Sequence, residues 1–200
     1  MSPRNPASGA PPARRRNAAA TKEALKRAAL EAFTRSGYDG VGLREIATAA
    51  GVDPRLVGRY FGSKAELFAE TLELTTESRP MVPPVTDDAA AELLTRPRAE
   101  NYLNGYLMTI RSTSNPEATA ILREVIERSG TQSVAARLSG PHRDGRAALL
   151  IAINMGILLM RDILGTAALT DEEAEELVPY LEAAYEAIAG PQEAGTESND

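Results

Sequence analysis

Residues 21–68 read TKEALKRAALEAFTRSGYDGVGLREIATAAGVDPRLVGRYFGSKAELF. Apolar residues recur there every three or four positions, which is the spacing of the buried face of an α-helix. The pattern is interrupted at Gly37 and again at Gly51, and Thr21 is the expected N-cap of the first segment. The stretch therefore predicts three consecutive helices, at 21–36, 43–50 and 54–61.

The second and third of these helices, separated by Gly51, have the pattern of a helix-turn-helix. Glycine can adopt the positive φ that the tight turn needs. Asp53 is the expected N-cap of the third helix, and Pro54 suits its first position. The apolar residues expected to pack the angle between the helices are Leu43, Ile46, Ala47, Val52, Val57 and Phe61.

A longer helix is predicted to follow, and the rest of the chain also has helical patterning. Ser63 and Glu66 have the spacing of a capping box. Three prolines between 79 and 87 end this helix, and Gly130 and Pro179 are positions where a later helix could split or kink. Beyond the prolines we expect helices at 87–95, 98–112, 116–138, 142–164 and 171–189.

The predicted fold class is all-α, with an N-terminal three-helix DNA-binding domain and a C-terminal helical domain. The ends of the chain are rich in Pro, Ala, Ser, Glu and Gly and lack an apolar period, so we expect them to be disordered. The predicted organisation is a basic disordered arm at 1–20, a helix-turn-helix domain at 21–66, a further helical domain at 67–190, and a disordered tail at 191–200.

Charge is distributed unevenly along the chain. Residues 1–64 hold 12 Lys and Arg against 5 Asp and Glu, whereas residues 65–200 hold 10 against 23. A basic N-terminal third favours an anionic partner for that part alone, although charges can also cluster by chance on a solvated surface. The three arginines at 14–16 could attract a DNA backbone, enter a minor groove, or only solubilise the arm.

Composition excludes several other functions. The chain has no cysteine and a single histidine, His142, so we expect no disulfide, no metal site and no cofactor. Neither a Ser/His/Asp set nor a glycine-rich phosphate loop is present, and we therefore expect no enzyme activity. The longest apolar stretch, 147–160, is shorter than the roughly 20 residues that a membrane helix needs. With no secretory signal at the N-terminus, we expect a cytoplasmic protein without a membrane partner.

The quoted stretch closely resembles the N-terminal domain of the tetracycline-repressor (TetR) family of transcriptional regulators. The resemblance covers 21–68 without gaps. Its most specific residues are Phe33, Gly37-Tyr38, Ile46-Ala47, Gly51-Val52 and Tyr60-Phe61-Gly62-Ser63-Lys64.

The resemblance implies a DNA interface centred on the helix from Pro54 to Tyr60. Arg44 and Arg55 match positions that face base edges, and the alternatives for each are a phosphate contact or a solvated surface. Three departures from the family's usual residues, Gly42, Leu56 and Gly58, change the detailed contact pattern. Arg59, Tyr60 and Lys64 match phosphate-contacting positions. The complete predicted DNA-binding set is Arg44, Pro54, Arg55, Leu56, Arg59, Tyr60 and Lys64.

The resemblance also implies that 67–190 is a ligand-binding and dimerisation domain. The implied homodimer forms when the helices at 142–164 and 171–189 pair with their twofold mates. The first of these helices is apolar over most of its circumference, as expected of a helix that is buried on several sides. The second carries an apolar stripe that we expect to lie at the interface, namely Leu177, Leu181, Ala184, Tyr185 and Ile188.

The function implied is that of a repressor that releases a double-stranded DNA operator when a small-molecule effector binds the C-terminal domain. We expect the signal to pass through the far end of the helix that begins at Ser63. A DNA-organising protein without a ligand is the alternative. Asn154 could meet the ligand, bond across the dimer, or bond to neighbouring backbone. The candidate ligand-lining residues are Tyr102, Tyr106, Met108, Asn154, Met155 and Met160.

Overall fold

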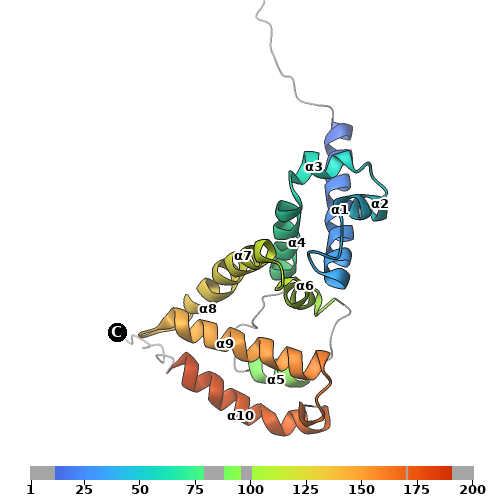
Figure 1. The fold of residues 1–200 in the computed structure, drawn as a ribbon. Helices are drawn as coiled ribbons and strands as arrows, with labels where there is room; N and C mark the ends of the chain where they lie inside the picture. The colour runs from blue at the N-terminus through green and yellow to red at the C-terminus, as the bar shows by residue number, and fades with distance from the viewer. Residues whose placement is uncertain (1–11, 79–87, 96–100, 170, 191–200) are drawn as a thin grey trace, which may run out of the picture.

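The computed structural model describes residues 12–78, 88–95, 101–169 and 171–190. Every element within these ranges is a helix, as the sequence predicted (Figure 1). None of the helices described is long and apolar enough to cross a membrane. The N-terminal elements are α1 (Pro12–Ser36), α2 (Leu43–Ala49), α3 (Arg55–Phe61) and α4 (Lys64–Ser78).

The remaining helices follow the predicted order. They are α5 (Ala89–Thr95), α6 (Asn104–Ser112), α7 (Pro116–Val125), the π-helical segment η1 (Ile126–Thr131), α8 (Gln132–Ala135), α9 (Arg143–Ile157), the π-helical segment η2 (Leu158–Ile163), the 3₁₀ turn η3 (Ala167–Leu169) and α10 (Asp171–Ala189). Proline 179 lies inside α10 without ending it. The predicted break at Gly130 is instead a π-helical turn within one long segment.

The first helix begins earlier than predicted. Residues 12–20 are helical, so the expected N-terminal arm is wrong for this part, and residues 1–11 lie outside the described residues. The local cause is Pro12 at the first helical position, followed by an alanine run at 18–20. Thr21 is therefore not an N-cap: its hydroxyl donates to the Asn17 carbonyl from inside the helix, at 2.7 Å. The expected disordered tail at 191–200 also lies outside the described residues.

The predicted start of α4 is confirmed, whereas α3 begins one residue later than predicted, with Pro54 as its N-cap. The Asp53 carboxylate accepts the backbone N–H of Arg55 at 2.8 Å, which satisfies an amide at the start of α3. Ser63 and Glu66 form the capping box of α4: Ser63 Oγ accepts the Glu66 N–H at 3.1 Å, and Glu66 Oε2 accepts the Ser63 N–H at 2.9 Å.

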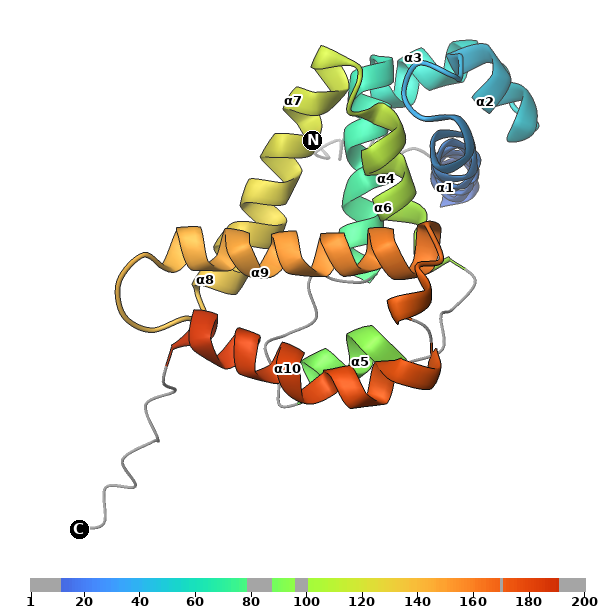
Figure 2. The same cartoon turned by 60° about the horizontal axis from the view of Figure 1, so that its bottom comes forward.

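The buried apolar side chains form two separate clusters. The first, which we call the head core, joins α1–α4 to one side of α6 and to α7, and includes Leu25, Phe33, Tyr38, Ile46, Ala47, Val57, Phe61, Leu67, Phe68, Met108, Leu122 and Val125. The second, the body core, joins α5 and α8–α10, and includes Leu93, Leu94, Tyr106, Val134, Leu150, Ile151, Leu181 and Tyr185. Figure 2 shows α1–α4 above α9, α5 and α10, with α6 beside α4 and α7 running down toward α9.

Two segments belong to both cores. On α6, Met108 is fully buried in the head core, whereas Tyr106 lies in the body core. Residues two positions apart on a helix point about 200° apart, so α6 faces both cores at once. Residues of α7 pack in the head core and residues of α8 pack in the body core. The π-helical turn η1 lies between these two helices. The head is therefore packed against the body through α6 and α7 as well as through α4.

Candidate nucleic-acid interface

The turn between α2 and α3 has the geometry of a helix-turn-helix. Gly51 has φ +68°, in the left-handed region that favours glycine. Val52 donates its N–H to the Ala47 carbonyl at 3.0 Å, which closes the turn. Ala47 is fully buried, as the close approach of the helices requires. All six residues expected to pack this angle belong to the head core or lie against it.

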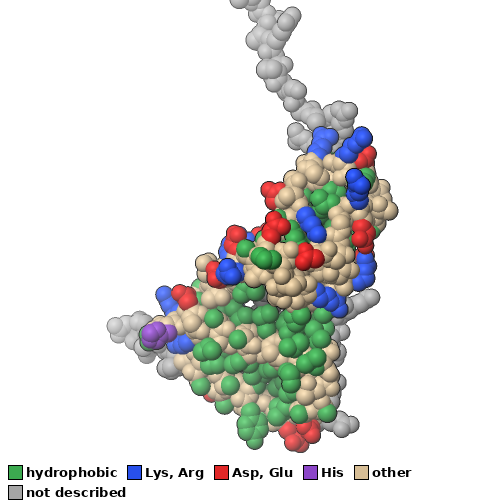
Figure 3. Space-filling model, in the orientation of Figure 1, with side chains coloured by type: hydrophobic (Ala, Val, Ile, Leu, Met, Phe, Trp, Pro, Cys, Tyr) green, Lys and Arg blue, Asp and Glu red, His purple; other side chains and the backbone are tan. Residues whose placement is uncertain are grey.

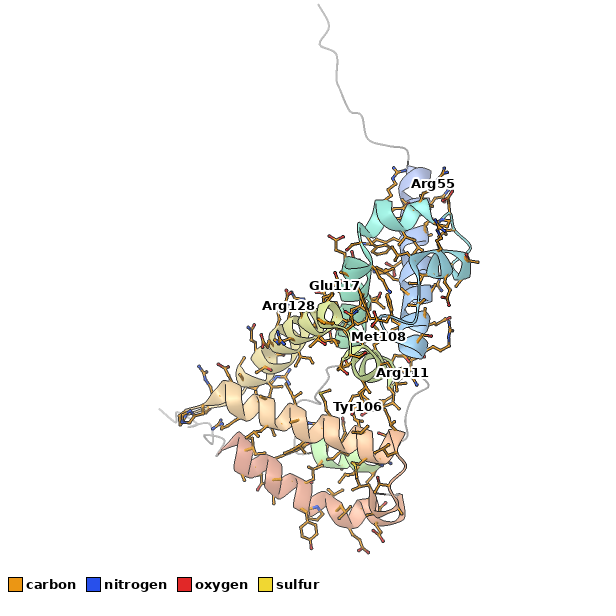
Figure 4. The ribbon with its side chains drawn as sticks, viewed as in Figure 1. Arg55, Tyr106, Met108, Arg111, Glu117 and Arg128 are labelled. Carbon is orange, nitrogen blue, oxygen red and sulfur yellow. The ribbon has the colours of Figure 1, made fainter. Side chains whose placement is uncertain are left out.

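One side of α3 is left facing solvent. Val57 and Phe61 are buried in the head core, whereas Pro54, Arg55 and Arg59 are exposed. Leu56 and Tyr60 are half-buried at the edges of this surface. Figure 4 places Arg55 at the end of the molecule farthest from α10, where α3 lies near the start of α1.

Within the part of the chain that the structure describes, the arginines of this surface have no acidic partner. Arg44, on α2, is exposed like Arg55 and Arg59, and none of the three forms an ion pair within the described residues. A guanidinium group that is not engaged by a carboxylate can donate two parallel hydrogen bonds to guanine or to a phosphate. The arrangement can therefore present three free cations to a polyanion.

The lysines of the head are more constrained than its arginines. Lys22 pairs with Glu70 at 2.8 Å and lies 5.1 Å from the centre of the Phe61 ring, so it ties α1 to α4. Lys26 pairs with Glu23 at 2.7 Å. Of the basic residues on the described part of the head, the arginines therefore supply most of the charge available to a ligand.

Lys64 has a partner that sequence reasoning missed. Its ammonium lies 4.6 Å from the centre of the Tyr38 ring and is half-buried. A cation in the first turn of a helix is opposed by the helix dipole, and the face of an aromatic ring offsets part of that cost. Lys64 is thus held at the α3–α4 junction. Its expected phosphate contact stays a prediction.

The polar groups expected to line a ligand site in the body are bonded within the chain. Asn154 is buried; its Nδ2 donates to the Leu150 carbonyl and its Oδ1 accepts the Tyr185 hydroxyl, both at 2.7 Å. Of the three roles considered for Asn154, bonding to neighbouring backbone is the one observed, together with this tyrosine. Burial raises the pKa of Tyr185 to about 12, although the hydrogen bond to Asn154 acts in the opposite direction.

The other candidate ligand residues are dispersed. The Tyr106 hydroxyl donates to the Met155 carbonyl at 2.7 Å, and Tyr102 and Met155 lie half-buried against the body core. Met108 packs in the head core, away from them, and Met160 is exposed. Figure 4 shows Met108 and Tyr106 on different sides of α6. The structure therefore brings together Tyr102, Tyr106, Asn154 and Met155 around one core but not Met108.

The predicted interface stripe on α10 is wrong. Leu181 and Tyr185 are buried in the body core, and Leu177 and Ile188 pack against it. The physical reason is α5, which lies against the inner side of α10 and takes up this stripe within the same chain. Apolar residues on the outer sides of α9, η2 and α10 are exposed instead, including Leu149, Met160, Ile163, Leu164 and Tyr180.

These residues, with exposed Ala148, Ala152 and Ala183, form what we call the α9–α10 face. Figure 3 shows hydrophobic side chains gathered over α9 and α10, in contrast to the charged surface of the head. Tyr180 is 76% exposed and Leu149 is 55% exposed. An apolar area of this kind on a folded chain is typical of a surface that another protein covers.

The far end of α4 contacts the body at two points. Gly105 on α6 lies against Thr75, and a Cβ at Gly105 would be only 2.5 Å from Thr75 Oγ1. Arg128, in the π-helical segment η1, forms an ion pair with Glu73 and a second one with Glu124 at 3.3 Å. A π-helical turn inside a helix is often a functional feature. The predicted signalling end of α4 is thus in contact with both segments that join the two cores.

Two family models match consecutive parts of the chain. Residues 25–71 match the family model of bacterial regulatory proteins of the tetR family. Residues 85–188 match the model of the tetracyclin repressor-like C-terminal domain. The boundary between the two models falls near the end of α4.

Individual proteins are also similar. The HTH-type transcriptional regulatory protein RaaS of Mycobacterium tuberculosis is 31% identical over 180 residues, which cover 82% of this chain and 84% of that protein. The HTH-type transcriptional repressor NicS of Pseudomonas putida is 36% identical over 53 residues, or 26% of this chain and 25% of NicS. The crystal structure of a transcriptional regulator from Rhodococcus sp. Rha1 has a TM-score of 0.57 and 25% identity, and the match covers 86% of this chain and 98% of that one.

Proposed function

Because the chain belongs to the tetracycline-repressor family of transcriptional regulators, we propose that it is a repressor that releases its operator when a small molecule binds the C-terminal domain. Regulators of this family are non-enzymatic proteins that bind DNA operators and act as dimers. The observation that carries the proposal is the exposed side of α2 and α3, which holds three arginines that form no ion pair with any described residue. It would act in the cytoplasm, where the operator is.

In the proposed complex α3 enters the major groove of double-stranded DNA. Arg55, near the start of α3, and Arg44, on α2, are then the side chains that contact base edges. Arg59, Tyr60 and Lys64 contact the phosphate backbone on either side. Pro54 and Leu56 complete the surface by apolar contact.

The dimer is proposed to form through the α9–α10 face. A twofold axis through this face brings two heads to one side of the assembly, as binding to two half-sites requires. The Leu181 side of α10 stays inside each subunit and contributes only to its fold.

The effector is proposed to act on the contact between the body and the far end of α4. The ligand would bind in the body, near Tyr102, Tyr106 and Met155, and favour a conformation in which α6 has moved. Since Gly105 lies against Thr75, a movement of α6 toward Thr75 displaces α4. A ligand that prefers the displaced conformation lowers DNA affinity by its difference in affinity for the two states.

The base-contact assignment is tested by Arg55→Ala and Arg44→Ala. Each variant is expected to lose about 1–3 kcal/mol of binding free energy on the selected operator and to accept more sequences at one position. Both side chains are exposed, so folding should be unaffected. The measurement is selection of bound duplexes from a randomised library, followed by sequencing. Unchanged sequence preference in both variants would contradict the assignment.

The phosphate-contact assignment has a different signature. Arg59→Ala and Lys64→Ala are expected to weaken binding to operator and to random duplex alike. Each should also lower the slope of log K against log salt concentration by about one unit, because one fewer counterion is released. Arg35→Ala is the matched control, since this exposed arginine lies in the last turn of α1 and already pairs with Glu45. A salt slope equal to the wild-type value in both variants would rule out the phosphate contacts.

A further inference from the structure

The turn between α1 and α2 is held by residues of the C-terminal domain. The corner between α6 and α7, residues 111–117, lies against this turn. The Tyr38 backbone N–H, which is buried, donates to Ser112 Oγ at 3.0 Å. Gly37 has φ +68° and leaves no space for a Cβ, which would overlap the Arg111 carbonyl. The corner therefore approaches the backbone of the head directly.

Two side-chain hydrogen bonds reinforce this contact. The Tyr38 hydroxyl donates to Glu117 Oε2 at 2.6 Å, and Asn115 Nδ2 donates to Asp39 Oδ1 at 2.7 Å. Arg111 also donates to the Thr34 carbonyl near the end of α1. Both side-chain bonds join the helix-turn-helix domain to the C-terminal domain, and both involve a carboxylate, which makes them stronger than neutral hydrogen bonds.

Asn115 has two roles at once. Its Oδ1 accepts the Ala118 N–H at 3.0 Å, so it is the N-cap of α7. Its Nδ2 is thereby oriented toward the turn, where it meets Asp39. The residue that caps α7 in the C-terminal domain thus also contacts the DNA-binding head.

We propose that the α6–α7 corner sets the orientation of the DNA-binding head, with Asn115 and Glu117 as positioning residues for operator binding. The inference rests on the proposed function. A head joined to the body only along α4 can rotate about that helix. A second attachment at the far end of α1 removes this freedom, so the two heads of a dimer are held ready for two half-sites. Less conformational entropy is then lost when the two heads bind DNA.

The α6–α7 corner packs against the head through apolar contacts, and the two polar pairs fix its orientation. Met108, Ala118 and Leu122 supply the apolar contact of α6 and α7 with the head core. Apolar contacts tolerate small rotations, whereas hydrogen bonds to a carboxylate do not. Tyr38 also contacts Phe68 edge-on, with ring centres 5.1 Å apart, so the orientation of the turn is passed to α4.

The test is a reciprocal exchange of Asp39 and Asn115. Asn115→Asp keeps an N-cap for α7 but places a second carboxylate against Asp39. Asp39→Asn together with Asn115→Asp restores the hydrogen bond, with the donor and the acceptor exchanged. The probes are a duplex selected by the wild-type protein from a randomised library and the same duplex with one half-site scrambled. Affinities are measured by fluorescence anisotropy, and folding by circular dichroism.

Asn115→Asp is expected to bind the complete duplex about tenfold more weakly than the wild type, the size of one charge-assisted hydrogen bond. Its affinity for the single half-site should be unchanged, and the double variant should regain the wild-type value. Glu117→Gln, which keeps an acceptor for Tyr38 without the charge, should have a smaller effect of the same kind.

Equal loss on complete and single half-sites would overturn the inference, because that is the result of structural damage alone. So would wild-type binding by Asn115→Asp, or a double variant that is no better than Asn115→Asp. A wild-type chain that selects no duplex would overturn the proposed function and this inference with it. The two failures are therefore distinguishable.

Discussion

Ala152→Glu and Tyr180→Glu are expected to convert the protein into folded monomers. Both residues are exposed on the α9–α10 face, so a glutamate is well hydrated in the isolated subunit. In a dimer formed through this face the same carboxylate is buried without a partner, which costs about 3–5 kcal/mol. Light scattering should report half the wild-type mass. Circular dichroism should report unchanged helix content.

The affinity for the operator should decrease when the dimer is lost. Two linked heads bind two half-sites with an effective concentration that raises affinity by about 10²–10⁴ over a single head. Monomeric variants should lose this factor on the complete operator and keep their affinity for one half-site.

Two control variants distinguish an effect on the α9–α10 face from an effect on folding. Ala120→Glu makes the same change at an exposed position of α7 and should leave a dimer. Leu181→Glu, one residue from Tyr180 but buried in the body core, should unfold the protein. Dimers of wild-type mass in both Ala152→Glu and Tyr180→Glu would exclude the α9–α10 face as the interface.

The contrast between Leu181 and Tyr180 also shows where sequence reasoning reaches its limit. Periodicity identified an apolar stripe on α10 but could not say which element covers it. That depends on α5, which lies more than 80 positions earlier in the chain. With α5 in place, the stripe is internal and the less apolar side of α10 becomes the exposed one.

The head was predictable because its signals are local. The glycine of the turn and the Ser63–Glu66 capping box each act within three residues, and both were found as predicted. Asp53 accepts the Arg55 N–H, although Pro54 is the N-cap of α3. The apolar residues between α2 and α3 follow from the same short segment. The local signal at Thr21 gave a wrong prediction, because an alanine-rich segment extends the helix on the N-terminal side of this residue.

Contacts between distant residues left no signal in the sequence. Tyr38 was recognised as part of a family motif, but its bonds to Ser112 and Glu117 join residues more than 70 positions apart. Asn154 could only be recognised as a polar residue in an apolar helix. Its partner Tyr185 lies on another helix, and only the packing of α9 against α10 brings the two together.

The second large effect is expected at Gly105, where α6 contacts the far end of α4. A Cβ at this position would be 2.9 Å from Thr75 Cβ as well as 2.5 Å from its Oγ1. Thr75 is β-branched and its hydroxyl is bonded to the Leu72 carbonyl, so the side chain cannot rotate away without cost. Gly105→Ala and, more strongly, Gly105→Val must therefore move the two helices apart.

The displacement should resemble the proposed effect of the ligand. In the absence of effector, Gly105→Val is expected to bind operator about 10–100-fold more weakly, the range of typical allosteric coupling. Thr75→Ala removes Oγ1 and Cγ2 and should restore part of the affinity in the Gly105→Ala background. Gel shift or anisotropy on the selected duplex gives the affinities, with light scattering to confirm the dimer. Wild-type affinity in a folded Gly105→Val dimer would show that α6 does not control the head through α4.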